Sequence, residues 1–377
     1  MWFFLIFLSV YGWANYFVIR RFLAVLPACT EPFRIFILIA LVVCSISYIA
    51  AKLLLVRYSN YFYDTVLWIG SFWFAILLYS LLFLLLVDSY KLARFVIRYI
   101  SHSGIVIPFI PPTIIFIAWI VIVTGFVAYG YWNANTIKTK LISISIPHKT
   151  KAGTFLKVLF LSDVHATPVN DGRIFDSILR VSNETKPDLI LMGGDIVDDK
   201  SNQLYRIGIH KKLQELSAPL GIYTCPGNHE YITGKEDTFA FLTNSGVHVL
   251  SDSVVTIKDI IQLIGRDDSR KRKSLEALKA QTSDALPIIL LDHQPFHLEQ
   301  AEQFGIDLQL SGHTHHGQMF PFNWITKKIY EVSWGYKQKG NTQYYVSSGA
   351  GTWGPPVRVG SNSEIILFTI TFTEPKK

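Results

Sequence analysis

The sequence predicts two parts of different fold class: a membrane region of about four α-helices over residues 1–132 and an α/β domain over residues 133–377. Long apolar runs fill the first part, whereas the second alternates short apolar runs with segments of helical period. The charges divide in the same way. Residues 1–135 contain eight Lys or Arg and three Asp or Glu, and the remainder contains 27 and 25.

Four apolar runs predict the membrane spans, at residues 2–19, 35–51, 66–87 and 113–131. Each is close to the roughly 20 apolar residues that a helix needs to cross a bilayer. No basic segment precedes the first run and no small-residue cleavage site follows it, so we expect an anchor and not a signal peptide. Residues 91–100 carry three basic side chains on one helical face, which fits a helix on the membrane surface or an ordinary connecting helix.

The basic residues near the spans also bear on orientation. Six lie close to the connections after the first and third spans, and four lie close in on the opposite side. By this margin of two, the positive-inside rule predicts a multi-pass protein of the cell membrane with both ends outside the cytoplasm. The nearly neutral second part has no basic patch, so we expect no nucleic-acid partner. The three cysteines form no CxxC pair, which excludes a cysteine-based zinc site.

Short apolar runs in the second part predict buried strands separated by helices. Alternation over residues 136–146 predicts an edge or meander strand. Further strands are expected at 158–165, 189–192, 222–225, 260–264, 287–291, 306–310, 344–346 and 364–371. Helical period is found at 171–181, 204–216 and 274–281.

Five of these strands run into turns that carry Asp, Asn or His. The residues are Asp163 and His165, Asp195, Asn228 and His229, His293, and His313 and His315. An extended backbone would place Asp163 and His165 on the same side. Carboxylates, amide oxygens and imidazoles bind Mn, Zn or Fe, and this number of ligands suits two ions. A polar strand end explains any one turn, but not five. We expect Gly227 and Gly312 to allow close backbone approach at the site, and a simple turn is the alternative for each.

The motifs D-V-H, G-G-D, G-N-H-E, D-H and G-H-T-H occur in the order that resembles the calcineurin-like metallophosphoesterases, over residues 136–372. The membrane-associated bacterial branch, with its YkuE-like and YaeI-like phosphoesterases, is more similar still. L-L-D-H-Q-P at 290–295, G-H-T-H-H-G-Q at 312–318 and Y-V-S-S-G-A-G-T-W-G at 345–354 carry this resemblance. It implies a two-sheet β-sandwich flanked by helices. His316 and Ser348 depart from the usual Gly and Arg of that branch, and Arg358 is retained.

The resemblance also implies roles. Asp163, His165 and His315 would hold one divalent ion, Asn228, His293 and His313 would hold the second, and Asp195 would bridge them. Asp195, Asn228 and His229 would be the catalytic residues. His229 would protonate or stabilise the leaving oxygen, with a hydrogen bond to a ligand as the alternative.

Several acids and one histidine near these motifs have less definite expectations. Asp267 or Asp268 would orient a ligand histidine, unless both are solvated turn residues. His297 could face the same way as His293 on a helix, but a surface cap is the commoner place for such a residue. Asp198 and Asp199 receive no role.

The predicted function is metal-dependent hydrolysis of a phosphodiester, phosphomonoester or pyrophosphate bond. A membrane anchor concentrates the domain near lipids, which favours a lipid-linked or envelope substrate. The resemblance, which extends to the lipid A pathway enzymes that cleave UDP-2,3-diacylglucosamine, implies that molecule as one example. One alternative is a non-catalytic metal-binding membrane sensor or scaffold. Another is a transporter, which the small number of charges within the apolar runs disfavours.

Overall fold

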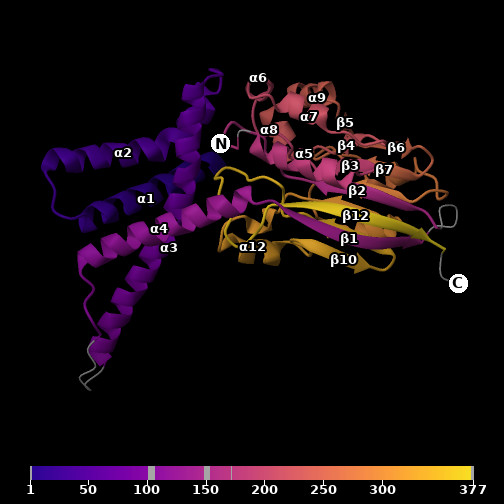
Figure 1. The fold of residues 1–377 in the computed structure, drawn as a ribbon. Coiled ribbons are helices and arrows are strands. Elements are labelled where there is room, and N and C mark those ends of the chain that lie inside the picture. The colour runs from indigo at the N-terminus through magenta and orange to yellow at the C-terminus, as the bar shows by residue number, and fades with distance from the viewer. Residues whose placement is uncertain (1, 101–106, 148–152, 171, 375–377) are drawn as a thin grey trace. The chain divides into compact units, whose positions relative to one another are not determined.

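The computed structural model describes residues 2–100, 107–147, 153–170 and 172–374. The chain forms two compact units, Met1–Gly130 and Tyr131–Lys377. Figure 1 shows that the first is made of helices and that the second contains the strands.

The helical unit contains four long helices. These are α1 (Trp2–Val25), α2 (Glu31–Ala50, continued by a π-helical turn over Ala51–Leu55), α3 (Tyr61–Ile100) and α4 (Pro112–Asn135). Within the described residues, three helical stretches are long and apolar enough to cross a membrane: Glu31–Leu55, Tyr61–Ile100 and Pro112–Asn135. The first expected span, 2–19, lies in α1, whose first side chains fall outside the described residues. Residues 91–100 continue α3 and form no separate helix.

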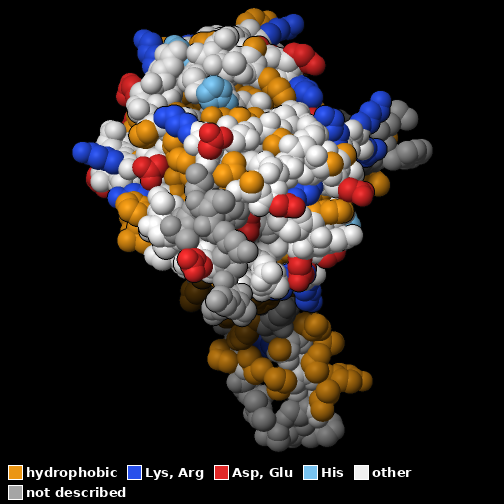
Figure 2. Space-filling view, turned by 90° about the vertical axis from the view of Figure 1, so that its right-hand side faces the viewer, with side chains coloured by type: hydrophobic (Ala, Val, Ile, Leu, Met, Phe, Trp, Pro, Cys, Tyr) orange, Lys and Arg blue, Asp and Glu red, His pale blue; other side chains and the backbone are white. Residues whose placement is uncertain are grey.

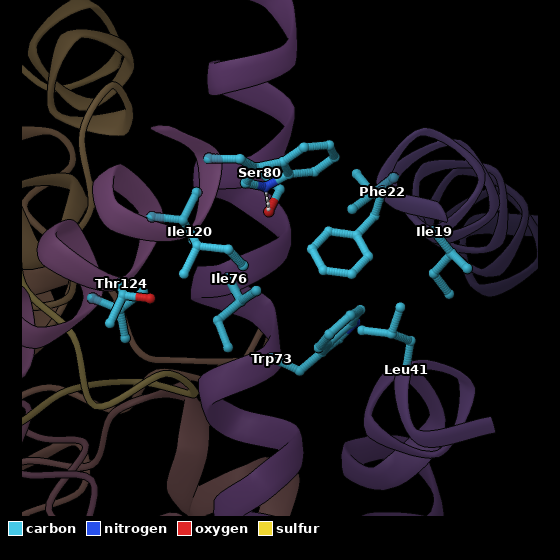
Figure 3. A pocket seen from close by; sticks show the side chains of 12 residues that line it. Ile19, Phe22, Leu41, Trp73, Ile76, Ser80, Ile120 and Thr124 are labelled. Carbon is cyan, nitrogen blue, oxygen red and sulfur yellow. Dashed lines mark hydrogen bonds between the residues drawn. The ribbon is translucent and has the colours of Figure 1, made fainter. Parts of the chain in front are cut away.

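Side chains of all four helices meet around an apolar cavity of about 300 Å³ (Figure 3). Two hydrogen bonds between side chains lie beside it, where an unpaired polar group would be costly. Trp119 donates its indole N–H to the hydroxyl of Ser80 at 3.0 Å, and Trp73 donates to the side-chain oxygen of Asn15 at 2.7 Å. Figure 2 shows that hydrophobic side chains cover the visible part of this unit.

Two six-stranded sheets form the second unit. The first has the order β1-β12-β2-β3-β4-β5 and the second the order β10-β11-β9-β8-β7-β6. The strands of the first sheet are β1 (Lys138–Pro147), β2 (Phe155–Leu161), β3 (Leu189–Met192), β4 (Ile222–Thr224), β5 (His248–Val249) and β12 (Glu364–Thr373). Those of the second are β6 (Ser253–Ile257), β7 (Ile261–Gly265), β8 (Ile288–Leu291), β9 (Leu308–Ser311), β10 (Gly335–Lys339) and β11 (Thr342–Val346).

Parallel pairing dominates both sheets. β2, β3, β4 and β5 are parallel, as are β7, β8, β9 and β11. β12 pairs in parallel with β1 and antiparallel with β2. The predicted edge strand is confirmed, since β1 ends the first sheet.

The two sheets pack face to face. Apolar side chains from both sheets, among them Phe160, Leu191, Leu263 and Leu310, form one fully buried cluster between them. Strands with two buried faces read as continuous apolar runs, as these do. The expected β-sandwich flanked by helices is therefore confirmed.

Helices cover the outer faces of the sandwich. α5 (Arg173–Thr185), α7 (Ile209–Glu215) and α9 (Lys235–Asn244) pack on the first sheet. α10 (Leu275–Lys279) and α11 (Leu298–Gln303) pack on the second. The single helix expected over 204–216 is wrong. Gly208, with φ of 78°, separates α6 (Ser201–Arg206) from α7 because a left-handed residue cannot continue a helix.

Candidate metal centre

The predicted site residues lie in five loops, each directly after a parallel strand. The loops follow β2, β3, β4, β8 and β9, and the third residue group, after β4, opens helix α8 (Asn228–Thr233). Carboxyl ends of parallel strands are where α/β folds place ligands. The two sheets thus contribute to one site from both sides of the sandwich.

Five of the predicted ligands have left-handed backbone conformations: Asp163, His165, Asp195, His313 and His315, with φ between 46° and 69°. The expectation that an extended backbone aligns Asp163 with His165 is therefore wrong, because β2 ends at Leu161. Each such residue costs about 1–3 kcal/mol, and strain of this kind collects at functional sites.

Asp163, His165 and His315 form the first cluster. Nε2 of His165 is 3.0 Å from Nε2 of His315, and Asp163 Oδ1 lies 3.5 Å from the latter nitrogen and 3.9 Å from the former. All three side chains are buried. One ligand atom from each lies within 4.8 Å of the others, an arrangement that fits a single cation.

Asp195, His293 and His313 form the second cluster. Oδ2 of Asp195 approaches Nε2 of His293 to 3.1 Å, yet this buried nitrogen has no hydrogen-bond partner within the described residues. Two side chains that bind the same ion come close to each other without forming a hydrogen bond between them. Asp195 and His293 have this arrangement. Asn228 joins the group, with Oδ1 3.0 Å from Nδ1 of His313.

Asp195 lies between the two clusters. The same oxygen that approaches His293 is 3.7 Å from Nε2 of His165. The structure therefore brings all seven predicted ligands together, with one oxygen of Asp195 facing a histidine of each cluster.

The charges in the site favour neutral imidazoles at three of the predicted ligands and an ionised Asp195 beside a protonated His293, whose pKa is raised well above its usual range because the charge of Asp195 outweighs burial. Burial lowers the pKa of His165 to about 4 and that of His313 to about 3, and it also lowers the pKa of His315. Burial alone would raise the pKa of Asp195, but the charge of His293 at 3.1 Å outweighs it, and the pKa falls well below its usual range. A neutral imidazole keeps the lone pair that a metal needs.

The carboxylate of Glu230 accepts hydrogen bonds from two of the loops that carry predicted ligands, the loops after β3 and β4. Its Oε2 accepts from the backbone N–H groups of Asp195 at 2.9 Å and Gly227 at 2.7 Å. Its Oε1 accepts from Ile196 at 2.8 Å and Val197 at 3.3 Å. One fully buried carboxylate thus fixes the backbone on both sides of Asp195.

Gly227 and Gly312 are in close contact with the proposed ligands. A Cβ at Gly227 would lie 2.2 Å from Asp195 Oδ1, and a Cβ at Gly312 would lie 2.2 Å from Asp163 Oδ2. No side chain fits at either position without moving a carboxylate. The expectation of close approach is confirmed at both glycines.

His229 is paired with Asp198, an acid for which we expected no role. Its Nδ1 lies 2.6 Å from Oδ1 of Asp198, and its backbone N–H donates to Asp195 at 2.8 Å. Burial lowers the pKa of His229, but the hydrogen bond and charge of Asp198 outweigh that effect and raise the pKa to about 9. The available signal for Asp198 was its place three residues after Asp195 in the same loop.

Several neighbouring expectations need correction. Asp267 bonds to Tyr231 and Ser251, and Asp268 accepts from Gln294, so neither orients a ligand histidine. Nδ1 of His293 instead lies 2.7 Å from the carbonyl oxygen of Gly193.

The remaining residues of interest lie outside the ligand set. His297 is an exposed residue at the start of α11, next to Glu299. His316 packs on Trp334, with ring centroids 5.3 Å apart. Ser348 donates to the carbonyl of Asn362. Arg358 is fully buried, donates to the carbonyls of Ser348 and Gly351, and approaches Nδ1 of His315 to 3.3 Å.

Comparisons with known proteins agree with this geometry. The calcineurin-like phosphoesterase family model matches residues 156–317. The chain is 33% identical over 253 residues to an uncharacterized metallophosphoesterase of Aquifex aeolicus, covering 64% of this chain and 95% of that one. It is 38% identical over 219 residues to an uncharacterized metallophosphoesterase of Helicobacter pylori, covering 56% of this chain and 58% of that one. A third relative, the transmembrane protein with metallophosphoesterase domain of Danio rerio, is 33% identical, with 65% of this chain and 60% of that one covered.

The chain belongs to the calcineurin-like metallophosphoesterases, a family of metal-dependent phosphoesterases, and the predicted resemblance is confirmed. It spans about 58% of the length of the Helicobacter pylori relatives. The three helices among the described residues that are long and apolar enough to cross a bilayer indicate that the chain is associated with a membrane.

Proposed function

We propose that this chain is a membrane-anchored phosphoesterase that uses two divalent cations, with the catalytic domain over residues 133–377. The single observation that supports this best is the position of Asp195 Oδ2, which is 3.1 Å from a histidine of one cluster and 3.7 Å from a histidine of the other. Two cations a few Å apart repel, and a shared carboxylate between them offsets that repulsion.

The ligand sets follow from the two clusters. We assign Asp163, His165 and His315 to one cation, Asn228, His293 and His313 to the other, and Asp195 to both. The mixture of carboxylate, amide oxygen and imidazole suits Mn, Zn or Fe. When bound, such cations would neutralise charge on a phosphoryl group and promote its attack by water.

His229 would act on the leaving group. Asp198 holds its Nδ1, which leaves Nε2 as the nitrogen that carries a transferable proton. The raised pKa of about 9 keeps the imidazole protonated at neutral pH, as a general acid requires. Loss of a phosphate ester's alcohol is easier when its oxygen receives this proton.

The proposed substrate is a phosphodiester, phosphomonoester or pyrophosphate carried by a lipid, of which UDP-2,3-diacylglucosamine is one example. Membrane helices in the same chain raise the local concentration of such molecules. The distribution of basic residues supports a multi-pass arrangement with the domain outside the cytoplasm.

The test uses the full chain purified in detergent, with a soluble chromogenic phosphodiester, bis(p-nitrophenyl) phosphate. We expect hydrolysis that depends on Mn²⁺ and falls at least about 100-fold in Asp195→Asn and in His293→Ala, because each removes a group that holds the cations. His297→Ala, an exposed histidine four residues away, is the matched control. Normal metal-dependent turnover in either site variant would refute the assignment. Metal analysis that finds bound cations without turnover would favour the sensor.

A further inference from the structure

Helix α12 (Phe322–Ile329) has its polarity reversed relative to an ordinary surface helix. Its large apolar side chains point outward: Phe322, Trp324, Ile325 and Ile329 are 41%, 60%, 51% and 58% exposed. The half-buried positions on its inner side are polar, Asn323 and Thr326. A helix on a water-exposed surface has the opposite pattern. The outer side of α12 is therefore suited to an apolar environment.

α12 also lies close to the metal centre, although its own side chains are not among the proposed ligands. A Cβ at Gly317 would lie 2.2 Å from the backbone nitrogen of Asn323, so α12 packs directly on the turn that bears His315. At the other end, the ring of Tyr330 lies 6.2 Å from that of His313. The helix thus runs beside one proposed ligand of each cation.

The loop 358–361 forms hydrogen bonds both to the end of the apolar helix α4 and to the segment just before α12. Asn133, near the end of α4, donates to the carbonyls of Arg358 at 3.1 Å and Ser361 at 2.8 Å. Val359 of the same loop accepts from the backbone N–H of Phe320, two residues before α12. The end of a membrane-crossing helix and the reversed helix therefore flank one loop of the domain.

We propose that α12 lies in the interfacial layer of the bilayer that α4 crosses, so that the metal centre takes the phosphate esters of lipids at the membrane surface. Trp324 suits this layer, where tryptophan is enriched. Lys327 and Lys328, both exposed, suit anionic head groups. The charged face seen in Figure 2, where basic and acidic side chains are interspersed over this unit, shows that an apolar exterior is not general to the domain.

The contact with the bilayer is tested without catalysis. Ile325→Cys is labelled with an environment-sensitive fluorophore in the full chain, after Cys29 and Cys44 are replaced by Ser; Cys225 is buried and stays. The chain is placed in nanodiscs of phosphatidylcholine and phosphatidylglycerol that carry a nitroxide high on the acyl chain. Phe155→Cys is the matched control, since Phe155 is 65% exposed but begins β2, at the opposite end of that strand from Asp163.

We expect a blue-shifted emission and strong nitroxide quenching at position 325, and weak quenching at position 155. Equal quenching at the two positions, or none at position 325, would overturn the proposal. This measurement does not depend on turnover, so it separates the membrane contact from the phosphoesterase activity on which the lipid substrate rests.

A second experiment tests the lipid substrate. The double variant Trp324→Ser/Ile325→Ser is compared with the native chain on phosphatidyl-p-nitrophenol in vesicles and on soluble bis(p-nitrophenyl) phosphate. We expect kcat/KM to fall about tenfold on the lipid diester and to change by less than about twofold on the soluble one, because apolar burial is lost only at the membrane. Equal losses on both substrates would contradict a membrane role. Absence of turnover by the native chain on either substrate would refute the phosphoesterase activity, whatever the labels report.

Discussion

Replacing Glu230 by Gln is predicted to loosen the metal centre without touching a proposed ligand. Glutamine keeps the size of the side chain, but its amide nitrogen would face N–H groups where Oε1 or Oε2 now accepts two hydrogen bonds. Two buried donors left without an acceptor cost about 1–3 kcal/mol each, so we expect a loss of about 2–6 kcal/mol.

The form of Glu230 that the structure requires is the ionised one. Burial raises its pKa, and the charge of Asp195 raises it further, to about 7. All four neighbouring groups are nonetheless N–H donors, and a protonated carboxyl would add a fifth donor among them. A neutral amide at this position is therefore expected to be unfavourable, even though it removes a buried charge.

The size of the effect can be measured as a melting temperature. For a unit of roughly 250 residues, 1 kcal/mol corresponds to about 2–4 °C, so the Tm of the C-terminal unit should fall by about 4–24 °C. The unfolding transition of the C-terminal unit can be told from that of the helical unit because added Mn²⁺ should raise its Tm. Because Asp195 loses its backbone support, the apparent affinity for Mn²⁺ in the phosphodiesterase assay should also fall, by about 10–100-fold.

The control for this variant is Glu236→Gln, an exposed glutamate at the start of α9. It removes the same charge from a neighbouring helix without orphaning a donor, and we expect no change in Tm or Mn²⁺ dependence. A Glu230→Gln variant that matched Glu236→Gln in both measurements would show that the four hydrogen bonds do not hold the loop that carries Asp195.

Three further predictions concern the same site. Gly312→Ala should weaken Mn²⁺ activation at least about tenfold, since its methyl group would displace Asp163; an unchanged titration would contradict this. Asp198→Asn removes the carboxylate that raises the pKa of His229 to about 9, so the alkaline fall in kcat should move to lower pH, more for alkyl than for p-nitrophenyl leaving groups. Bound cations would lower that value, so profiles are compared at equal Mn²⁺ loading, and coincident profiles would refute the pairing. Chelation should lower the Tm of the C-terminal unit. Mn²⁺ at 100 times its Kd should restore about 2.7 kcal/mol of folding stability, and a Tm that changed with neither treatment would argue against a resident cation.

The proposed ligands could be found from sequence because each is marked locally. An apolar run followed at once by Asp, Asn or His is a pattern of a few residues, and the fold places the ends of these runs together. The conformation at Asp163 and His165 was not predictable in this way. Their backbone N–H groups bond to the carbonyls of Gly194 and Asp195, so a neighbouring loop about 30 residues away sets their left-handed shape.

Two other features had no local signal. Asp198 looks like any loop acid until the fold brings it within 2.6 Å of His229. α12 was not predicted from the sequence. Periodicity arguments assume that the apolar side chains of a helix face a protein core, and those of α12 are exposed. Strand order in the first sheet was likewise out of reach, since residues 138–147 pair with residues more than 220 positions later.

That long-range pairing determines when the domain can close. β12 lies between β1 and β2, and it is made last. Until the ribosome has passed Thr373, β1 lacks this partner and one edge of β2 stays open, whereas the strands of the second sheet have all been synthesised by Val346. The same strand delivers Glu364, which accepts from the backbone N–H of Ser348 beside Arg358. The loops that carry the proposed ligands are therefore braced only after β12 has been synthesised, long after the helices of the first unit.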